Sequence, residues 1–239
     1  MSEPLRVALV AEGPTDHVVI EAALRSMLKE RPFVLTQIFP EGSTSFGELG
    51  SGWVGVYRWC HKSARRGQGR LSSDEILFQN CDLLILHLDA DVAGYSYNDG
   101  SITPDSTDGA LPCALDCPPP SDTTNVLRMV LLSWCGEAAT PARTVICMPS
   151  KSTEAWVVAA LFPRDLAMSN NSIECHPNPE SRLGQQPKAN RLRKKKREYQ
   201  ERSEEMKDAW PRVAAQHALG EAYRFQSEFW AAVPDSVRL

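Results

Sequence analysis

RVALVAEGPTD, residues 6–16, is the stretch that decides the fold. Its first half, residues 6–11, is a short apolar run of the kind found in strands that are buried on both faces. A turn follows at residues 12–16, and beyond it the apolar positions between Val18 and Leu28 recur at helical spacing. The stretch therefore predicts a strand, a turn and a helix, with a carboxylate directly after the strand.

Similar units recur further along the chain. The runs DLLILHL at 82–88 and TVICM at 144–148 are expected to be buried strands, and FVLTQIF at 33–39 a weaker one. Helical patterns follow at 126–134 and 153–161. This alternation predicts an α/β fold in which helices flank a mostly parallel sheet.

Some stretches between these units lack a clear period. Residues 42–73 are expected to be a loop with a short helix or a lid. Residues 92–124 are expected to be a long irregular insertion, and residues 166–189 a polar linker. From residue 191 the composition is helical. We therefore expect an α/β domain at 1–165, followed by a linker and helical C-terminal extension at 166–239.

Composition restricts the class of protein. The chain has 239 residues, of which 42% are hydrophobic and 23% charged, which excludes a disordered or collagen-like chain. No apolar run approaches the roughly 20 residues of a membrane helix, and the N-terminus has too short an apolar core for a secretory signal. We therefore expect a cytoplasmic protein that does not contact the membrane. The seven cysteines are odd in number and several lie in apolar segments, so we expect them to be reduced.

Carboxylates lie where the predicted strands end. Glu12 follows the first strand, Asp89 and Asp91 follow the strand at 82–88, and Glu154 lies in the first turn of a later helix. Ligands of open parallel sheets bind at the carboxyl ends of the strands. Asp89 and Asp91 are two residues apart, so in extended backbone their side chains would leave on one side. The carboxylates of such a cluster repel one another unless they are protonated or neutralised, and a divalent cation such as Mg²⁺ is the natural neutralising partner.

These motifs resemble the Toprim family of topoisomerases, primases and OLD-type nucleases. The resemblance rests on EGPTD at 12–16 and LLILHLDAD at 83–91, with MPSKSTEAW at 148–156 similar to a helix of stand-alone bacterial Toprim-type proteins. It covers roughly residues 5–162 in the family's order, and it departs from the family in the length and polarity of 92–124. It implies a Toprim/Rossmann-like fold and a metal-dependent phosphodiester hydrolase acting on DNA or RNA, plausible in bacterial phage defence, with an ATPase as a possible partner.

The resemblance also implies roles for individual residues. The ligands of Mg²⁺ or Mn²⁺ would be the five acids: Glu12, Asp16, Asp89, Asp91 and Glu154. Glu12 would also serve as general acid or base, Glu154 would help to hold a second metal, and Lys151 would steady the charge that develops on the phosphate. Two metals would activate water and stabilise the leaving oxygen of an in-line displacement.

The same residues also have purely structural explanations, which are alternatives to these roles. Residues 12–16 can be a tight turn with a helix cap, 89–91 a solvated strand end, and Glu154 a first-turn acid that favours the helix dipole. His87 lies in an apolar strand, and we expect a packed residue or one that orients a ligand. His17, beside Asp16, has at best the same indirect role.

Two further clusters have structural alternatives as well. The aromatic side chains Trp53, Tyr57 and Trp59 are expected to pack rather than to stack on bases. A zinc site is a weak alternative, because its spacing matches no standard finger; its members would be Cys113, Cys117, Cys175 and His176.

Residues 188–197 form a basic block in a chain whose net charge is −4. Its cations are candidate contacts to nucleic acid, with a solvated surface as the alternative: Lys188, Arg191, Arg193, Lys194, Lys195, Lys196 and Arg197. Two rival functions stay open beside hydrolysis. One is a nucleotide- or phosphate-binding module without turnover, and the other is an interaction subunit of a larger complex.

Overall fold

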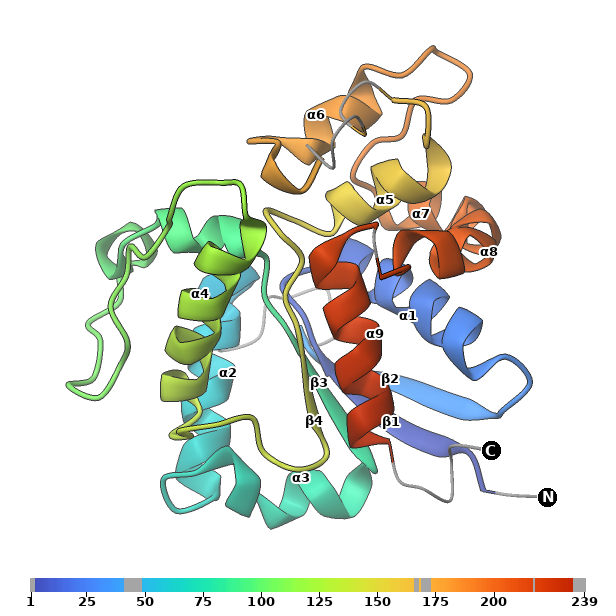
Figure 1. Ribbon diagram of the computed structural model, residues 1–239. Helices are drawn as coiled ribbons and strands as arrows, with labels where there is room; N and C mark the ends of the chain where they lie inside the picture. The colour runs from blue at the N-terminus through green and yellow to red at the C-terminus, as the bar shows by residue number, and fades with distance from the viewer. Residues whose placement is uncertain (1–2, 41–48, 166–167, 169–172, 217, 234–239) are drawn as a thin grey trace.

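Four parallel strands form the sheet at the centre of the molecule (Figure 1). The computed structural model describes residues 3–40, 49–165, 168, 173–216 and 218–233. The strands are β1 (Leu5–Val10), β2 (Phe33–Phe39), β3 (Leu83–His87) and β4 (Thr144–Cys147), in the spatial order β2-β1-β3-β4. The predicted α/β fold with a parallel sheet is therefore confirmed.

Helices cover both faces of the sheet (Figure 1). One layer contains α1 (Pro14–Leu28), α5 (Glu154–Leu161), α8 (Ser203–Val213) and α9 (Gly220–Ala232). The other contains α2 (Gly52–Arg66), α3 (Glu75–Asn80) and α4 (Pro120–Trp134). Two short helices, α6 (Pro179–Gly184) and α7 (Lys196–Glu201), complete the C-terminal part. All five residues of β3 are buried because the strand lies between both layers.

Alternate residues of β1 enter different cores. Val7 and Leu9 pack with the layer of α1 and α9, whereas Ala8 and Val10 pack with the layer of α2 and α4. This is the period of two that an extended strand imposes. With both faces covered, β1 holds the start of α1 rigidly at the carboxyl edge of the sheet.

The stretch at 42–73 contains α2, while residues 41–48 lie outside the described part of the chain. Tyr57 and Trp59 on this helix are buried in the core, so the packing explanation for these aromatic residues is confirmed. Trp53 stacks against Tyr95, with ring centroids 6.3 Å apart.

The insertion at 92–124 is shorter than the sequence indicates. The helix expected to start at residue 126 begins at Pro120, since a proline is well tolerated in a first helical turn that has no hydrogen-bond partners for its N–H groups. Before it lie the 3₁₀ turns Ala90–Gly94 and Tyr97–Gly100. The Trp134 indole N–H donates to the Tyr97 hydroxyl over 2.8 Å, which fastens the insertion to α4.

The C-terminal helices share a core with the sheet. The Trp156 ring on α5 lies 5.4 Å from that of Trp210 on α8 and 5.9 Å from that of Phe225 on α9. The division into 1–165 and 166–239 stays a prediction, but these contacts show that both parts pack together. Among the described residues, no helix has the length and apolarity that crossing a membrane requires.

Candidate metal centre

Three buried side chains from two strand exits meet at the carboxyl edge of the sheet. Asp16 lies in the first turn of α1, His87 ends β3, and Asp89 follows two residues later. One potential ligand atom from each residue lies within 4.8 Å of those of the other two. The side chains are at most 8% exposed, so water solvates them poorly. Such a buried group of acids needs positive charge close by.

The His87 ring lies between the two aspartates. Its Nε2 is 3.2 Å from Asp89 Oδ1, and its Nδ1 is 3.9 Å from Asp16 Oδ2. Neither nitrogen has a well-directed hydrogen bond within the described part of the chain, although both are fully buried. Buried ring nitrogens without a hydrogen bond are uncommon, and a metal ion is one partner that satisfies them. Two carboxylates and an imidazole could hold a divalent cation, and two of the predicted ligands, Asp16 and Asp89, belong to this group, whereas His87 was not expected to be a ligand.

Thr153, just before α5, joins the two aspartates. Its backbone N–H donates to Asp89 Oδ1 over 3.1 Å, and its hydroxyl donates to Asp16 Oδ1 over 2.7 Å. The backbone N–H of Gly13 donates to the other Asp16 oxygen, Oδ2, over 2.9 Å. These donors fix the orientation of both carboxylates before any ligand binds.

Glu12 lies next to this group. Its Oε1 accepts a hydrogen bond of 2.7 Å from the backbone N–H of Asp89. The turn after β1 therefore reaches the end of β3, as expected for neighbouring parallel strands. Its role as a ligand or a general base stays a prediction.

The electrostatics of the group follow from burial and mutual repulsion. Burial and the charge of Asp16 raise the pKa of Asp89 to about 7, although His87 opposes the shift. Burial and the charge of Asp89 raise the pKa of Glu12 well above its usual range. Burial alone would lower the pKa of His87, but the charges of Asp16 and Asp89 outweigh it and raise that pKa to about 9. In the absence of a metal, the group is thus stabilised by protons that a cation would displace.

Glu154 lies beside this group with partners of its own. Its side chain is fully buried, and its Oε1 accepts a hydrogen bond of 2.9 Å from the Tyr199 hydroxyl. Lys194 Nζ lies 3.2 Å from the same oxygen. The charges of Glu154, Asp89 and Asp16 raise the pKa of Lys194 despite its partial burial, so this cation also acts on the metal-binding group. Glu154 as a ligand of a second metal stays a prediction.

Asp91 and Lys151 are the two remaining predicted site residues. The backbone turns into a 3₁₀ helix directly after Asp89, so the extended geometry expected for residues 89–91 is wrong. Asp91 is exposed and lies outside the group formed by Asp16, His87 and Asp89 among the described residues. Its backbone N–H donates to the carbonyl of Lys151, which has a left-handed φ of 63°. The roles proposed for Asp91 and Lys151 stay predictions.

The basic block divides into one inward cation and a group on the surface. Lys194, a candidate contact to nucleic acid, pairs with Glu154 and keeps 37% of its side chain exposed. Other cations of the block line a hollow of about 530 Å³ together with Arg202: Arg191, Arg193, Lys195 and Arg197. Glu198 pairs with Arg193, and Glu201 pairs with Arg197. Lys188 and Lys196 are exposed. Contact of these cations with nucleic acid stays a prediction.

Two of the cysteines expected to be reduced form a disulfide. Cys117 and Cys175 are bonded, with their Cα atoms 5.5 Å apart, which ties the insertion to the segment before α6. Sequence separation conceals this proximity, because the two cysteines are 58 positions apart in the chain. Within the described residues, the alternative zinc site formed by these cysteines, Cys113 and His176 is not present as a ligand group.

Sequence reasoning assigned no role at the site to Thr153 or Tyr199 and only an indirect one to His87. An apolar strand hides His87, although a histidine two residues before an aspartate at a strand end is a signal that could have indicated it. Comparison with protein-family descriptions, with curated proteins and with solved structures finds no match for this chain. The geometry of the site is therefore the evidence on which function is argued.

Proposed function

We propose that the chain is a divalent-metal-dependent phosphodiester hydrolase of Toprim type that acts on nucleic acid. The observation that carries this proposal is the buried group of Asp16, His87 and Asp89, whose histidine nitrogens lack hydrogen-bond partners among the described residues. Its place at the carboxyl edge of a parallel sheet is where such folds bind their ligands.

Mg²⁺ or Mn²⁺ is the cation that we propose for the site. Carboxylate oxygens suit both ions, and the imidazole of His87 favours Mn²⁺ over Mg²⁺, which prefers oxygen ligands and water. A bound divalent ion would supply Lewis acidity and lower the pKa of a water ligand. Asp16 and Asp89 would hold the ion, and Thr153 would keep both carboxylates in place.

Other residues near the site would transfer the proton of the attacking water and stabilise the negative charge of the phosphate. Glu12, which lies next to the group and accepts a hydrogen bond from the backbone N–H of Asp89, would serve as the general acid or base. Lys194 and Lys151 would place positive charge at the phosphate, and the cations around the hollow near Arg191 would contact phosphates further along a strand.

One observation favours an alternative, a site that binds metal and phosphate without hydrolysis. Asp16 is 2% exposed and His87 is fully buried, so a large substrate has little direct access to either side chain. Such a site would hold an ion tightly and leave every phosphodiester intact.

The experiment that tests the proposal is a cleavage assay. Supercoiled plasmid, single-stranded DNA and RNA are incubated with Mg²⁺ or Mn²⁺ and wild type, Asp89→Asn or Asp208→Asn. Asp208 is a matched acid whose side chain is 75% exposed on α8. Cleavage that Asp89→Asn loses and Asp208→Asn keeps, with all three proteins folded by circular dichroism, supports the proposal. Absence of metal-dependent cleavage of all three substrates contradicts it and favours the non-hydrolytic alternative.

A further inference from the structure

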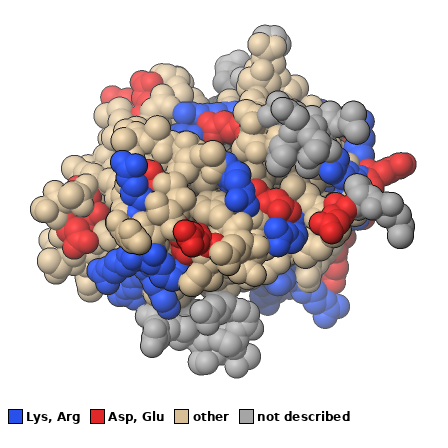
Figure 2. Space-filling model, turned by 90° about the horizontal axis from the view of Figure 1, so that it is seen from below, with Lys and Arg blue, Asp and Glu red and all other residues tan. Residues whose placement is uncertain are grey.

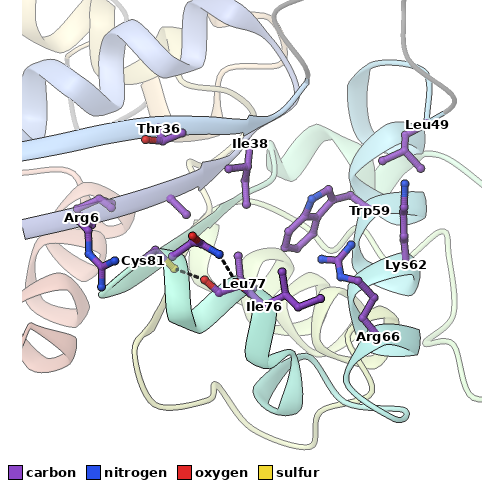
Figure 3. Close-up of a pocket in the computed structure, with 13 residues that line it drawn as sticks. Arg6, Thr36, Ile38, Leu49, Trp59, Lys62, Arg66, Ile76, Leu77 and Cys81 are labelled. Atoms are coloured by element: carbon purple, nitrogen blue, oxygen red, sulfur yellow. Dashed lines mark hydrogen bonds between the residues drawn. The ribbon is translucent and has the colours of Figure 1, made fainter.

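A second cavity lies on the α2 side of the sheet, away from the metal centre. It has a volume of about 390 Å³, which is within the range of small-molecule sites. Its walls come from β1, β2, α2 and α3, as Figure 3 shows. The group of Asp16, His87 and Asp89 contributes none of its lining.

The cavity exists because β2 is an edge strand that α2 covers only in part. Thr36 and Ile38 point from β2 into the opening, and Thr36 is exposed. Trp59 forms the opposite wall, and Leu77 and Cys81 lie at the base. The walls are therefore largely apolar, which suits the hydrocarbon or aromatic body of a ligand.

The charged groups among the described residues that line the cavity are all positive. They are Arg6, Lys62 and Arg66, and none of the described lining residues is an Asp or a Glu. Asp82 holds Arg6 and Asp74 holds Arg66, which fixes both guanidinium groups. Lys62 has no ion-pair or hydrogen-bond partner among the described residues. Figure 2 shows the molecule from the side on which α3 lies in Figure 1. Lys and Arg side chains gather at one edge of this face.

We propose that this cavity binds an organic anion, with its apolar body against Trp59 and Ile38 and its acidic group at Lys62. The complementary charge comes mainly from Lys62, because Arg6 and Arg66 are each paired with an aspartate. The inference is independent of the proposed hydrolysis, since none of the residues involved belongs to the metal centre.

The test uses 8-anilino-1-naphthalenesulfonate, an aromatic anion whose fluorescence rises in apolar surroundings. Wild type is expected to bind one probe saturably. Lys62→Gln is expected to weaken binding by about three- to fivefold, the effect of one exposed ion pair. Thr36→Phe is expected to weaken it by about tenfold or more, because the ring fills the opening. Thr36 is exposed on an edge strand, where phenylalanine is well tolerated.

Three comparisons make the result specific. Arg65→Gln removes the same charge from α2 at an exposed position outside the cavity and is expected to bind as wild type does. N-phenyl-1-naphthylamine, which lacks the sulfonate, is expected to bind wild type more weakly than the anionic probe. Asp89→Asn is expected to bind the probe unchanged, whatever the cleavage assay shows. Unchanged binding in Thr36→Phe would overturn the location, and unchanged binding in Lys62→Gln would overturn the recognition of the anion.

Discussion

Lys194 Nζ lies 3.2 Å from Glu154 Oε1, so a cation from the basic block neutralises the buried acid at the start of α5. Glu154 has no exposed side-chain surface, whereas Lys194 keeps 37% of its own. The pair connects a segment expected to contact nucleic acid with the acidic residues at the sheet edge. The charge balance of the site therefore depends on residues far apart in the sequence.

Lys194→Met is expected to destabilise the fold, because it leaves the Glu154 carboxylate buried without its cation. Breaking a fully buried pair costs about 3–5 kcal/mol, and the partial exposure of Lys194 reduces the expected loss to about 1–3 kcal/mol. Urea unfolding measures the change. The neighbouring Lys195→Met is the control, and adding Glu154→Gln to Lys194→Met is expected to recover part of the loss. Equal stability of Lys194→Met and Lys195→Met would show that the pair contributes nothing.

Mn²⁺ is expected to raise the melting temperature of wild type and to leave that of His87→Gln unchanged. An ion that binds only the folded state stabilises it by about 2.7 kcal/mol at one hundred times its dissociation constant. Differential scanning fluorimetry with Mn²⁺, and again after chelation, measures the shift. His176→Gln replaces a histidine outside the site and should keep the full shift. If His87→Gln keeps it too, the ion binds elsewhere.

Asp74→Asn is expected to reduce the loss of stability at acid pH. Burial alone would raise the pKa of Asp74, but hydrogen bonds from Arg66 and Ser63 outweigh it and lower the pKa below its usual range. A carboxyl with a lowered folded-state pKa stabilises the fold above its unfolded pKa, and that stability is lost as the pH falls through the folded pKa. Unfolding free energies between about pH 5 and pH 2 should therefore fall less steeply in Asp74→Asn than in wild type. Asp208→Asn should retain the wild-type slope, and a parallel decline in all three proteins would contradict the prediction.

The disulfide predicts a thiol count and a stability change. Denatured protein should show the five free cysteines without reductant and all seven after reduction. Cys117→Ser is expected to lower the free energy of unfolding by up to about 4 kcal/mol, since a bond across 58 residues restricts the unfolded chain. Cys113→Ser, at a free cysteine of the same insertion, should have a smaller effect. Seven reactive thiols before reduction would refute the bond.

Trp156→Ala is expected to cost about 3–5 kcal/mol, because it removes a buried ring that packs between the sheet and the C-terminal helices. Trp156→Phe should cost less, since an aromatic ring remains against Trp210 and the variant lacks the indole N–H, which has no hydrogen-bond partner among the residues that the structure describes. Chemical denaturation measures both. Similar losses in the two variants would mean that ring packing is not the main contribution.

The strands of the fold follow closely from the sequence. The run at 82–88 predicts β3 (Leu83–His87), and FVLTQIF at 33–39 coincides with β2. Apolar runs with strand-like composition carry this information locally. The start of α4 is less predictable, because Pro119 and Pro120 read as loop residues although Pro120 opens the helix.

The metal centre is predictable in part. Strand exits indicate Asp16 and Asp89, because parallel strands bring their carboxyl ends together. The inward direction of Lys194 is not predictable, since its neighbours are equally basic and only tertiary packing brings Lys194 to Glu154. The Cys117–Cys175 pairing is concealed for the same reason.

The partners of Glu154 also bear on the order in which the protein is made. Synthesis proceeds from the N-terminus, and folding can begin before it ends. A nascent chain that has passed α5 already contains every acid of the site but still lacks Lys194 and Tyr199. Until those residues leave the ribosome, Glu154 has neither its cation nor its phenol. Co-translational folding can therefore complete the sheet early, while the charge balance of its acidic edge is established only after α7 has emerged.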